Sequence, residues 1–114
     1  MVDSTRVRDR LTAERARTEY RIAALEAEFI DLVDAGTGTN IDDEHDPEGA
    51  TIAYERAQVS ALLHQAQDDL AALDLALERV DNGTAQTCES CGGSIALERL
   101  LALPTTRQCI RCAS

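Results

Sequence analysis

The sequence contains no tryptophan and no lysine, and aromatic residues make up only 3% of its 114 positions. A core built on large aromatic side chains is therefore excluded. No apolar run approaches the roughly 18–20 residues of a membrane-spanning helix, and the first ten residues lack the apolar segment of a secretory signal. All eleven basic residues are arginine and face 21 acidic residues, for a net charge of −10. A protein held to nucleic acid mainly through phosphate contacts would carry the opposite balance.

Length and hydrophobic content together predict a small folded protein. The chain is long enough for one domain, or for a small domain with an appendage. With 44% hydrophobic and 28% charged residues, it is too apolar for a disordered acidic tail. Its four cysteines favour a reducing, cytoplasmic location, where thiols hold a metal more often than they form disulfides.

The negative charge is concentrated in the middle of the chain. Residues 1–21 carry a net charge of +2, residues 22–81 carry −13, and residues 82–114 carry +1. The density is highest where five carboxylates fall within seven residues: Asp42, Asp43, Glu44, Asp46 and Glu48. An ordinary solvated loop, with acids that favour a helix N-terminus, would also explain this cluster.

Two long segments have the composition and periodicity of helices. From about Thr5 to Asp34 there is no glycine or proline, and strong helix formers predominate. An apolar seam with 4-3 spacing runs along this segment, formed by Thr18, Ile22, Leu25, Phe29 and Leu32. Glu14 and Arg15 interrupt the seam near the N-terminus, so we expect the first turns to fray or to pack elsewhere.

The second seam is cleaner. It contains Arg56 as its one polar intruder and consists of Ile52, Val59, Leu63, Ala66, Leu70, Leu73, Leu77 and Val80. Asp81-Asn82-Gly83 is expected to end this helix, because these residues tolerate left-handed backbone conformations. Pro47 fits the first turn of the helix, with Asp46 as its N-cap and Thr51 as a competing start.

Between the two helices, residues 35–40 contain two glycines and an asparagine, which predicts a turn. Two helices of about 30 residues reach roughly 45 Å, and neither can bury its seam alone. We therefore expect a mainly α protein: a long antiparallel coiled-coil hairpin over residues 1–82, with an acidic tip at about 36–50. Residues 83–114 would form a small C-terminal lobe.

The cysteines have the spacing of a zinc site. Cys88 and Cys91 form one C-x2-C pair, Cys109 and Cys112 form another, and seventeen residues separate the two pairs. Four thiolates leave no open coordination position, so the metal is expected to be one structural zinc ion. Zinc would stabilise a lobe too small to fold by burial alone. A redox dithiol is the competing interpretation.

The hairpin, the acidic tip and the zinc lobe occur in an order that resembles the DksA/TraR family of C4 zinc-finger proteins. The upstream segment Asp46–Thr51 contributes to the resemblance, and in the lobe it is carried by Cys88, Glu89, Cys91, Gly92, Ile95, Arg99, Leu100, Ala102, Pro104, Cys109, Ile110 and Cys112. Such a resemblance implies a bacterial protein that binds RNA polymerase, inserts its coiled coil into the secondary channel and modulates transcription initiation. No membrane and no specific DNA site are expected as partners.

The resemblance also implies site residues and departures from the family pattern. The expected partner-binding residues are Asp42, Asp43, Asp46, Glu48 and Ala50 at the tip, and Arg99 in the zinc lobe. The family's tip pattern, Asp-x-x-Asp-x-Ala, aligns with His45, Glu48 and Ala50. Asp43 and Asp46 offer an acid pair at the same spacing, but then Glu48 occupies the alanine position. Two positions that are basic in the family are Leu103 and Ala113, which argues against guanosine tetraphosphate as a partner.

Other function classes remain open at this stage. The coiled coil could serve a zinc-stapled interaction or dimerisation module without polymerase activity. Arg99, Arg107 and Arg111 offer weak support for nucleic-acid binding through the zinc lobe. No catalytic serine–histidine–acid arrangement, phosphate-binding glycine loop or HExxH motif is present, so the chain is not expected to be an enzyme.

Overall fold

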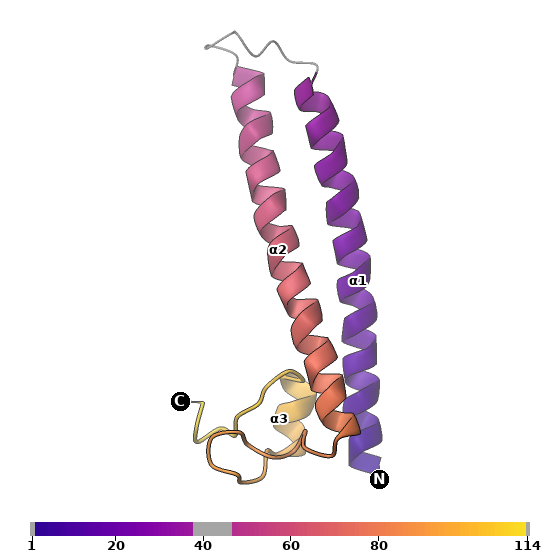
Figure 1. The fold of residues 1–114 in the computed structure, drawn as a ribbon, viewed down its shortest axis with the longest axis vertical. Coiled ribbons are helices and arrows are strands. Elements are labelled where there is room, and N and C mark those ends of the chain that lie inside the picture. Colours follow the sequence, from indigo (N-terminus) through magenta and orange to yellow (C-terminus); the bar gives the residue numbers. More distant parts are fainter. Residues whose placement is uncertain (1, 38–46, 114) are drawn as a thin grey trace. The chain divides into compact units, whose positions relative to one another are not determined.

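In a computed structural model of the protein, the described residues are 2–37 and 47–113. They contain the helices α1 (Val2–Thr37), α2 (Pro47–Asp81) and α3 (Leu97–Ala102) (Figure 1). Turns and one isolated antiparallel bridge between Thr87 and Ser94 make up most of the remainder. Within these ranges no helix is long and apolar enough to cross a membrane. The mainly α fold class, with two long helices that pack against each other, is confirmed.

The long helices extend slightly beyond their predicted ends. Helix α1 begins at Val2 and continues through Gly36 to Thr37, whereas the sequence predicted a break after Asp34. Helix α2 begins at Pro47, so Thr51 lies inside the helix and does not start it. Proline suits this position because its missing N–H would have no partner within the first turn. The predicted N-cap, Asp46, lies outside the described residues.

Helix α2 ends at Asp81, as the segment Asp81-Asn82-Gly83 predicted, and the structure shows a Schellman motif there. The backbone N–H of Thr84 donates to the carbonyl of Arg79 (2.9 Å), and that of Gly83 donates to Val80 (3.2 Å). Gly83 has a φ of +76°, a left-handed conformation that is costly for residues with a Cβ atom. The chain thus turns sharply from α2 into the segment that carries the first two cysteines.

The described residues form two compact units. One unit consists of residues 19–68, which contain the C-terminal part of α1 and the N-terminal part of α2. The other consists of residues 1–18 and 69–114, which contain the N-terminal part of α1, the C-terminal part of α2 and all the cysteines. We refer to them as the hairpin unit and the zinc unit. The division of the chain into domains at residues 82 and 83 stays a prediction.

In the hairpin unit the two predicted seams face inward. Val59 and Ala66 of α2 are buried, while the α1 seam residues from Ile22 to Leu32 are half-buried. A Cβ atom on Gly36 would lie 3.9 Å from Cγ2 of Ile52, so the end of α1 lies beside the start of α2. The pairing is therefore antiparallel, and small aliphatic side chains suffice to fill it.

In the zinc unit the first turns of α1 do not fray. Leu11 is fully buried (0% exposed) and Val7 is nearly so. They belong to one core cluster whose other members come from α2 and the C-terminal lobe: Leu73, Ala76, Val80, Cys88, Ile95 and Leu100. The seam continues through Val7, Leu11, Glu14 and Thr18 with the same spacing. Thr18 is buried, and its hydroxyl donates to the carbonyl of Glu14 (2.9 Å).

Replacement of Leu11 should test whether the N-terminal turns stabilise the zinc unit. A fully buried leucine truncated to alanine loses burial and leaves a cavity, so Leu11→Ala should lower the free energy of unfolding by about 2–5 kcal/mol. Tyr20→Ala is the control, because Tyr20 is 79% exposed on the same helix. Urea denaturation followed by circular dichroism measures both. Equal stability of the two variants would contradict the assigned core.

Candidate metal centre

The first cysteine pair lies in a tight turn after α2. The carbonyl of Gln86 accepts from the N–H of Ile95 (2.8 Å), and the N–H of Cys88 donates to Gly93 (2.8 Å), which closes a short hairpin-like loop. Gly92 has a φ of +74°, so a glycine is required at the bend. The N–H of Gly93 points at the sulfur of Cys91 (3.4 Å).

The second cysteine pair forms a similar turn near the end of the described chain. The N–H groups of Cys112 and Ala113 both donate to the carbonyl of Cys109 (3.1 Å each). Helix α3 and the turn after it connect the two pairs, and Thr106 N–H donates to the carbonyl of Leu103 (3.0 Å) in that turn. Each pair therefore presents two sulfurs on one side of a backbone turn.

The four sulfurs converge as a tetrahedral zinc site requires. Those of Cys88, Cys91, Cys109 and Cys112 all lie within 4.8 Å of one another. The sulfurs of Cys91 and Cys109 are 3.7 Å apart. With a Zn–S bond of about 2.3 Å, the edge of an S4 tetrahedron is about 3.8 Å, whereas a disulfide would need about 2.05 Å. The geometry fits one structural zinc, and the predicted cofactor is confirmed.

The electrostatics of the cluster also favour a cation. Backbone hydrogen bonds from Cys109, Cys91 and Ser90 lower the pKa of the Cys88 thiol to about 6. The crowding has the opposite effect on Cys112, whose hydrogen bonds with the Cys109, Cys88 and Cys91 sulfurs raise its pKa to about 12. The four groups cannot all ionise beside one another without positive charge. A divalent ion that binds thiolates supplies this charge.

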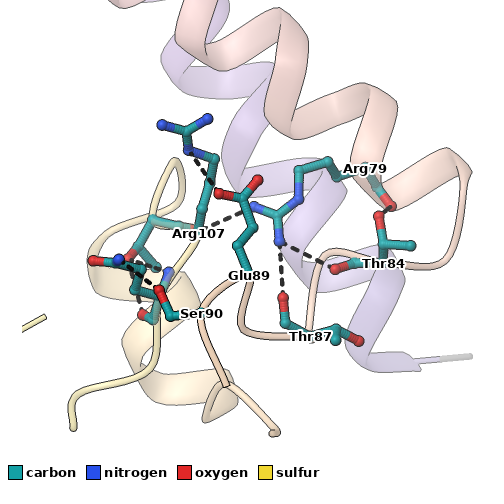
Figure 2. A network of polar contacts seen from close by, with 8 residues as sticks. Arg79, Thr84, Thr87, Glu89, Ser90 and Arg107 are labelled. Carbon is teal, nitrogen blue, oxygen red and sulfur yellow. Dashed lines mark hydrogen bonds and ion pairs between the residues drawn. The ribbon is translucent and has the colours of Figure 1, made fainter. Parts of the chain in front are cut away.

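Cross-links between the two turns hold the cluster together (Figure 2). The N–H of Glu89 donates to the carbonyl of Arg107 (2.9 Å), and the side chains of the same two residues form an ion pair (3.7 Å). The side-chain amide of Gln108 donates to the hydroxyl of Ser90 (2.8 Å). Residues that directly follow Cys88 are thus tied to residues that directly precede Cys109.

Burial is uneven across the four ligands. Cys88 is 1% exposed and belongs to the hydrophobic core, whereas Cys91 is exposed. Beside Cys91 and Cys109 lies a groove of about 620 Å³, whose lining includes Arg99, Leu103 and Ile110. Leu103, which directly follows α3, is 52% exposed. The site thus has one ligand in the core and one at the surface.

The structure describes only some of the predicted partner-binding residues. Asp42, Asp43 and Asp46 lie outside the described residues, and so does the side chain of Glu48. Ala50 is exposed in α2. Arg99 lies in α3 and donates to the carbonyl of Gln108 (3.0 Å). Their role in partner binding stays a prediction.

A helical hairpin with a C4 zinc finger is the class of protein that this fold and site define. Residues 83–114 match the family model of the prokaryotic dksA/traR C4-type zinc finger. The chain is also similar in structure to the transcription factor DksA2 from Pseudomonas aeruginosa, with a TM-score of 0.85 and 27% sequence identity. That match covers 99% of this chain and 81% of DksA2. The C-terminal lobe is therefore a zinc finger of the DksA/TraR type on a DksA-like fold.

Sequence relatives match shorter stretches. A protein of Aquifex aeolicus is 49% identical over 41 residues, which are 36% of this chain and 28% of the relative. The Bacillus subtilis protein YteA is 40% identical over 63 residues, which are 55% of this chain and 26% of YteA. YlyA, from the same organism, is 36% identical over 55 residues, or 48% of this chain and 44% of YlyA. The chain thus spans less than half the length of each of these relatives.

Metal removal should loosen the zinc unit selectively. We expect one zinc per chain by metal analysis, and none in Cys109→Ser, because three thiolates and a hydroxyl bind zinc far more weakly. Chelation should speed amide exchange at residues 7–11 and 73–80, since Cys88 shares their core. Residues 59–66 of the hairpin unit are the internal reference.

Thr105→Ala is the matched control for Cys109→Ser, because Thr105 is exposed in the turn between the two cysteine pairs. It should retain the metal and the exchange pattern of the parent protein. Full zinc content in Cys109→Ser would contradict the four-cysteine ligand set. Uniform acceleration of exchange in both units on chelation would contradict the selective coupling.

Proposed function

We propose that this protein is a bacterial transcription regulator that binds RNA polymerase directly. In this proposal the coiled coil enters the secondary channel of the enzyme and modulates initiation, while the zinc finger serves as a structural base. The observation that carries the proposal is the similarity to DksA2, a transcription factor, over 99% of this chain. The zinc finger of the same type supports it independently.

The physical properties of the hairpin unit suit such a role. Its two antiparallel helix segments are each about 30 Å long at 1.5 Å per residue, and a two-helix cross-section is narrow. The residues of this unit, 19–68, carry a net charge of −10, which favours a partner surface of positive charge or a bound metal ion. We propose Asp42, Asp43, Asp46, Glu48 and Ala50 as the residues that contact the polymerase.

Direct DNA binding is not part of the proposal. Of the three arginines of the zinc finger, Arg99 donates to the carbonyl of Gln108, and Arg107 pairs with Glu89. Contacts with phosphate would have to break these bonds, and the negative charge of the chain opposes an approach to nucleic acid. We also propose a cytoplasmic location, no catalytic activity, and no dependence on guanosine tetraphosphate, given the uncharged Leu103 and Ala113.

Association with the cognate polymerase core enzyme is the first test. The purified protein should co-elute with core enzyme in gel filtration, and a second factor that occludes the secondary channel should displace it. Failure to associate would refute the proposal, and so would association that persists when the channel is occluded.

Tip variants test the proposed contact residues. Asp43→Ala, Asp46→Ala and Glu48→Ala combined should leave polymerase binding intact but abolish the effect on open-complex lifetime, because they remove charge only at the tip. The matched control is a triple variant of three exposed acids of α1: Glu26→Ala, Glu28→Ala and Asp31→Ala. It removes the same amount of negative charge away from the tip. Equal loss of effect in both triples would show that net charge matters, not the tip.

A zinc-stapled dimerisation or interaction module is the second candidate function. It is favoured by large side chains that the hairpin unit leaves exposed: Tyr20, Ile30, Tyr54 and Leu62. The monomer mass is 12.4 kDa. Light scattering coupled to gel filtration should find that mass if the first proposal holds, whereas a stable dimer that Tyr20→Ala dissociates would favour the second.

A further inference from the structure

An arginine at the end of α2 holds the backbone just before the first cysteine. One guanidinium nitrogen of Arg79 donates to the carbonyls of Thr87 (3.0 Å) and Thr84 (3.2 Å). The other donates to the carbonyl of Thr106 (3.4 Å), in the segment between α3 and Cys109. Figure 2 shows Arg79 reaching from the helix toward Thr84 and Thr87. One side chain thus binds three carbonyls. One of them belongs to Thr87, the residue next to Cys88.

A second arginine has the same relation to the second cysteine pair. The Nε of Arg99, on α3, donates to the carbonyl of Gln108 (3.0 Å), the residue next to Cys109. Its terminal nitrogen donates to the hydroxyl of Thr106 (3.4 Å), and that hydroxyl in turn donates to the carbonyl of Gln108 (3.2 Å). The entrance to each cysteine turn is therefore held by a guanidinium group, and both groups also contact Thr106.

The position of a carbonyl before a cysteine affects where its sulfur points. That carbonyl belongs to the peptide plane that ends at the cysteine nitrogen, so its orientation sets the start of the turn. A planar guanidinium carries five N–H donors in a fixed fork, and can hold several carbonyls at once. A lysine ammonium at the same place has a flexible stem and cannot keep the same geometry.

We propose that Arg79 and Arg99 are positioning residues of the zinc site. They do not touch the metal. They hold the two cysteine turns in the arrangement that zinc requires, and so raise the affinity for zinc and slow its release. Groups outside the ligand set change metal affinity by about 10–100-fold when they are removed, because they orient the ligands. Without the arginines, binding of zinc would have to order both turns.

The test measures zinc affinity and release and requires no polymerase, so it is independent of the proposed function. Zinc is titrated against a chromophoric chelator for the parent protein, Arg79→Gln and Arg99→Gln. We expect a 10–100-fold weaker zinc affinity and faster release in each variant. Arg79→Lys should recover only part of the affinity.

Arg8→Gln is the matched control. Arg8 also lies in the zinc unit, but its guanidinium pairs with the carboxylate of Asp81 (2.6 Å) and not with the cysteine turns. We expect its zinc affinity to equal that of the parent. Thr106→Val removes the hydroxyl that Arg99 and Gln108 share while it keeps every charge, so it should weaken zinc binding less than Arg99→Gln does. It also serves as the test if an arginine variant does not fold.

Cobalt substitution separates positioning from general stability. Cobalt bound by four thiolates has visible absorption bands that depend on the angles around the metal. These bands should shift in Arg79→Gln and Arg99→Gln and remain unchanged in Arg8→Gln. Parent-like affinity and spectra in both arginine variants would overturn the proposal. It would also be overturned if affinity fell in Arg8→Gln as much as in the other two, because the effect would then be a general loss of stability.

Discussion

Burial of the Cys88 sulfur is the interaction on which the zinc unit depends. This thiol is both a metal ligand and a member of the hydrophobic core that α1, α2 and the lobe share. A buried thiolate without a cation would be costly, and a lobe of this size has little apolar area to stabilise it. The metal therefore stabilises the lobe and the ends of both long helices together. Coordination and hydrophobic packing cannot be separated at this residue.

Polar contacts also hold the two cysteine turns together. The two cysteine turns are connected by contacts of Glu89 with Arg107 and of Ser90 with Gln108. Arg79 connects the finger to α2. Arg79 and Arg99 donate to backbone carbonyls of a lobe that has almost no regular secondary structure. Arginine suits this task, since one group can satisfy several acceptors. In the zinc finger, Arg99 and Arg107 bind groups of the finger itself. The hairpin unit has an excess of acidic residues over arginines.

Much of the fold could be predicted because its signals are local. The heptad seams, Gly83 after α2 and Pro47 at its start depend on a few neighbouring residues, and all appear as expected. Other features could not be predicted in the same way. Val7 and Leu11 continue the α1 seam, but Glu14 obscures it, and the lobe that buries them lies about 90 residues away in the chain. Leu103, which directly follows α3, is apolar but exposed, whereas Leu100 within the helix is buried.

The sequence by itself identified the four metal ligands, because the spacing of two C-x2-C pairs is typical of a zinc site. It also determined the two helices and the location of the negative charge. Only the tertiary structure decided which sulfur is buried, which arginines hold the cysteine turns, and that the N-terminal turns of α1 belong to the zinc unit. These features depend on contacts between segments far apart in the chain. No periodicity or motif predicts such contacts, because the residues next to each of these side chains in the sequence form no recognisable pattern.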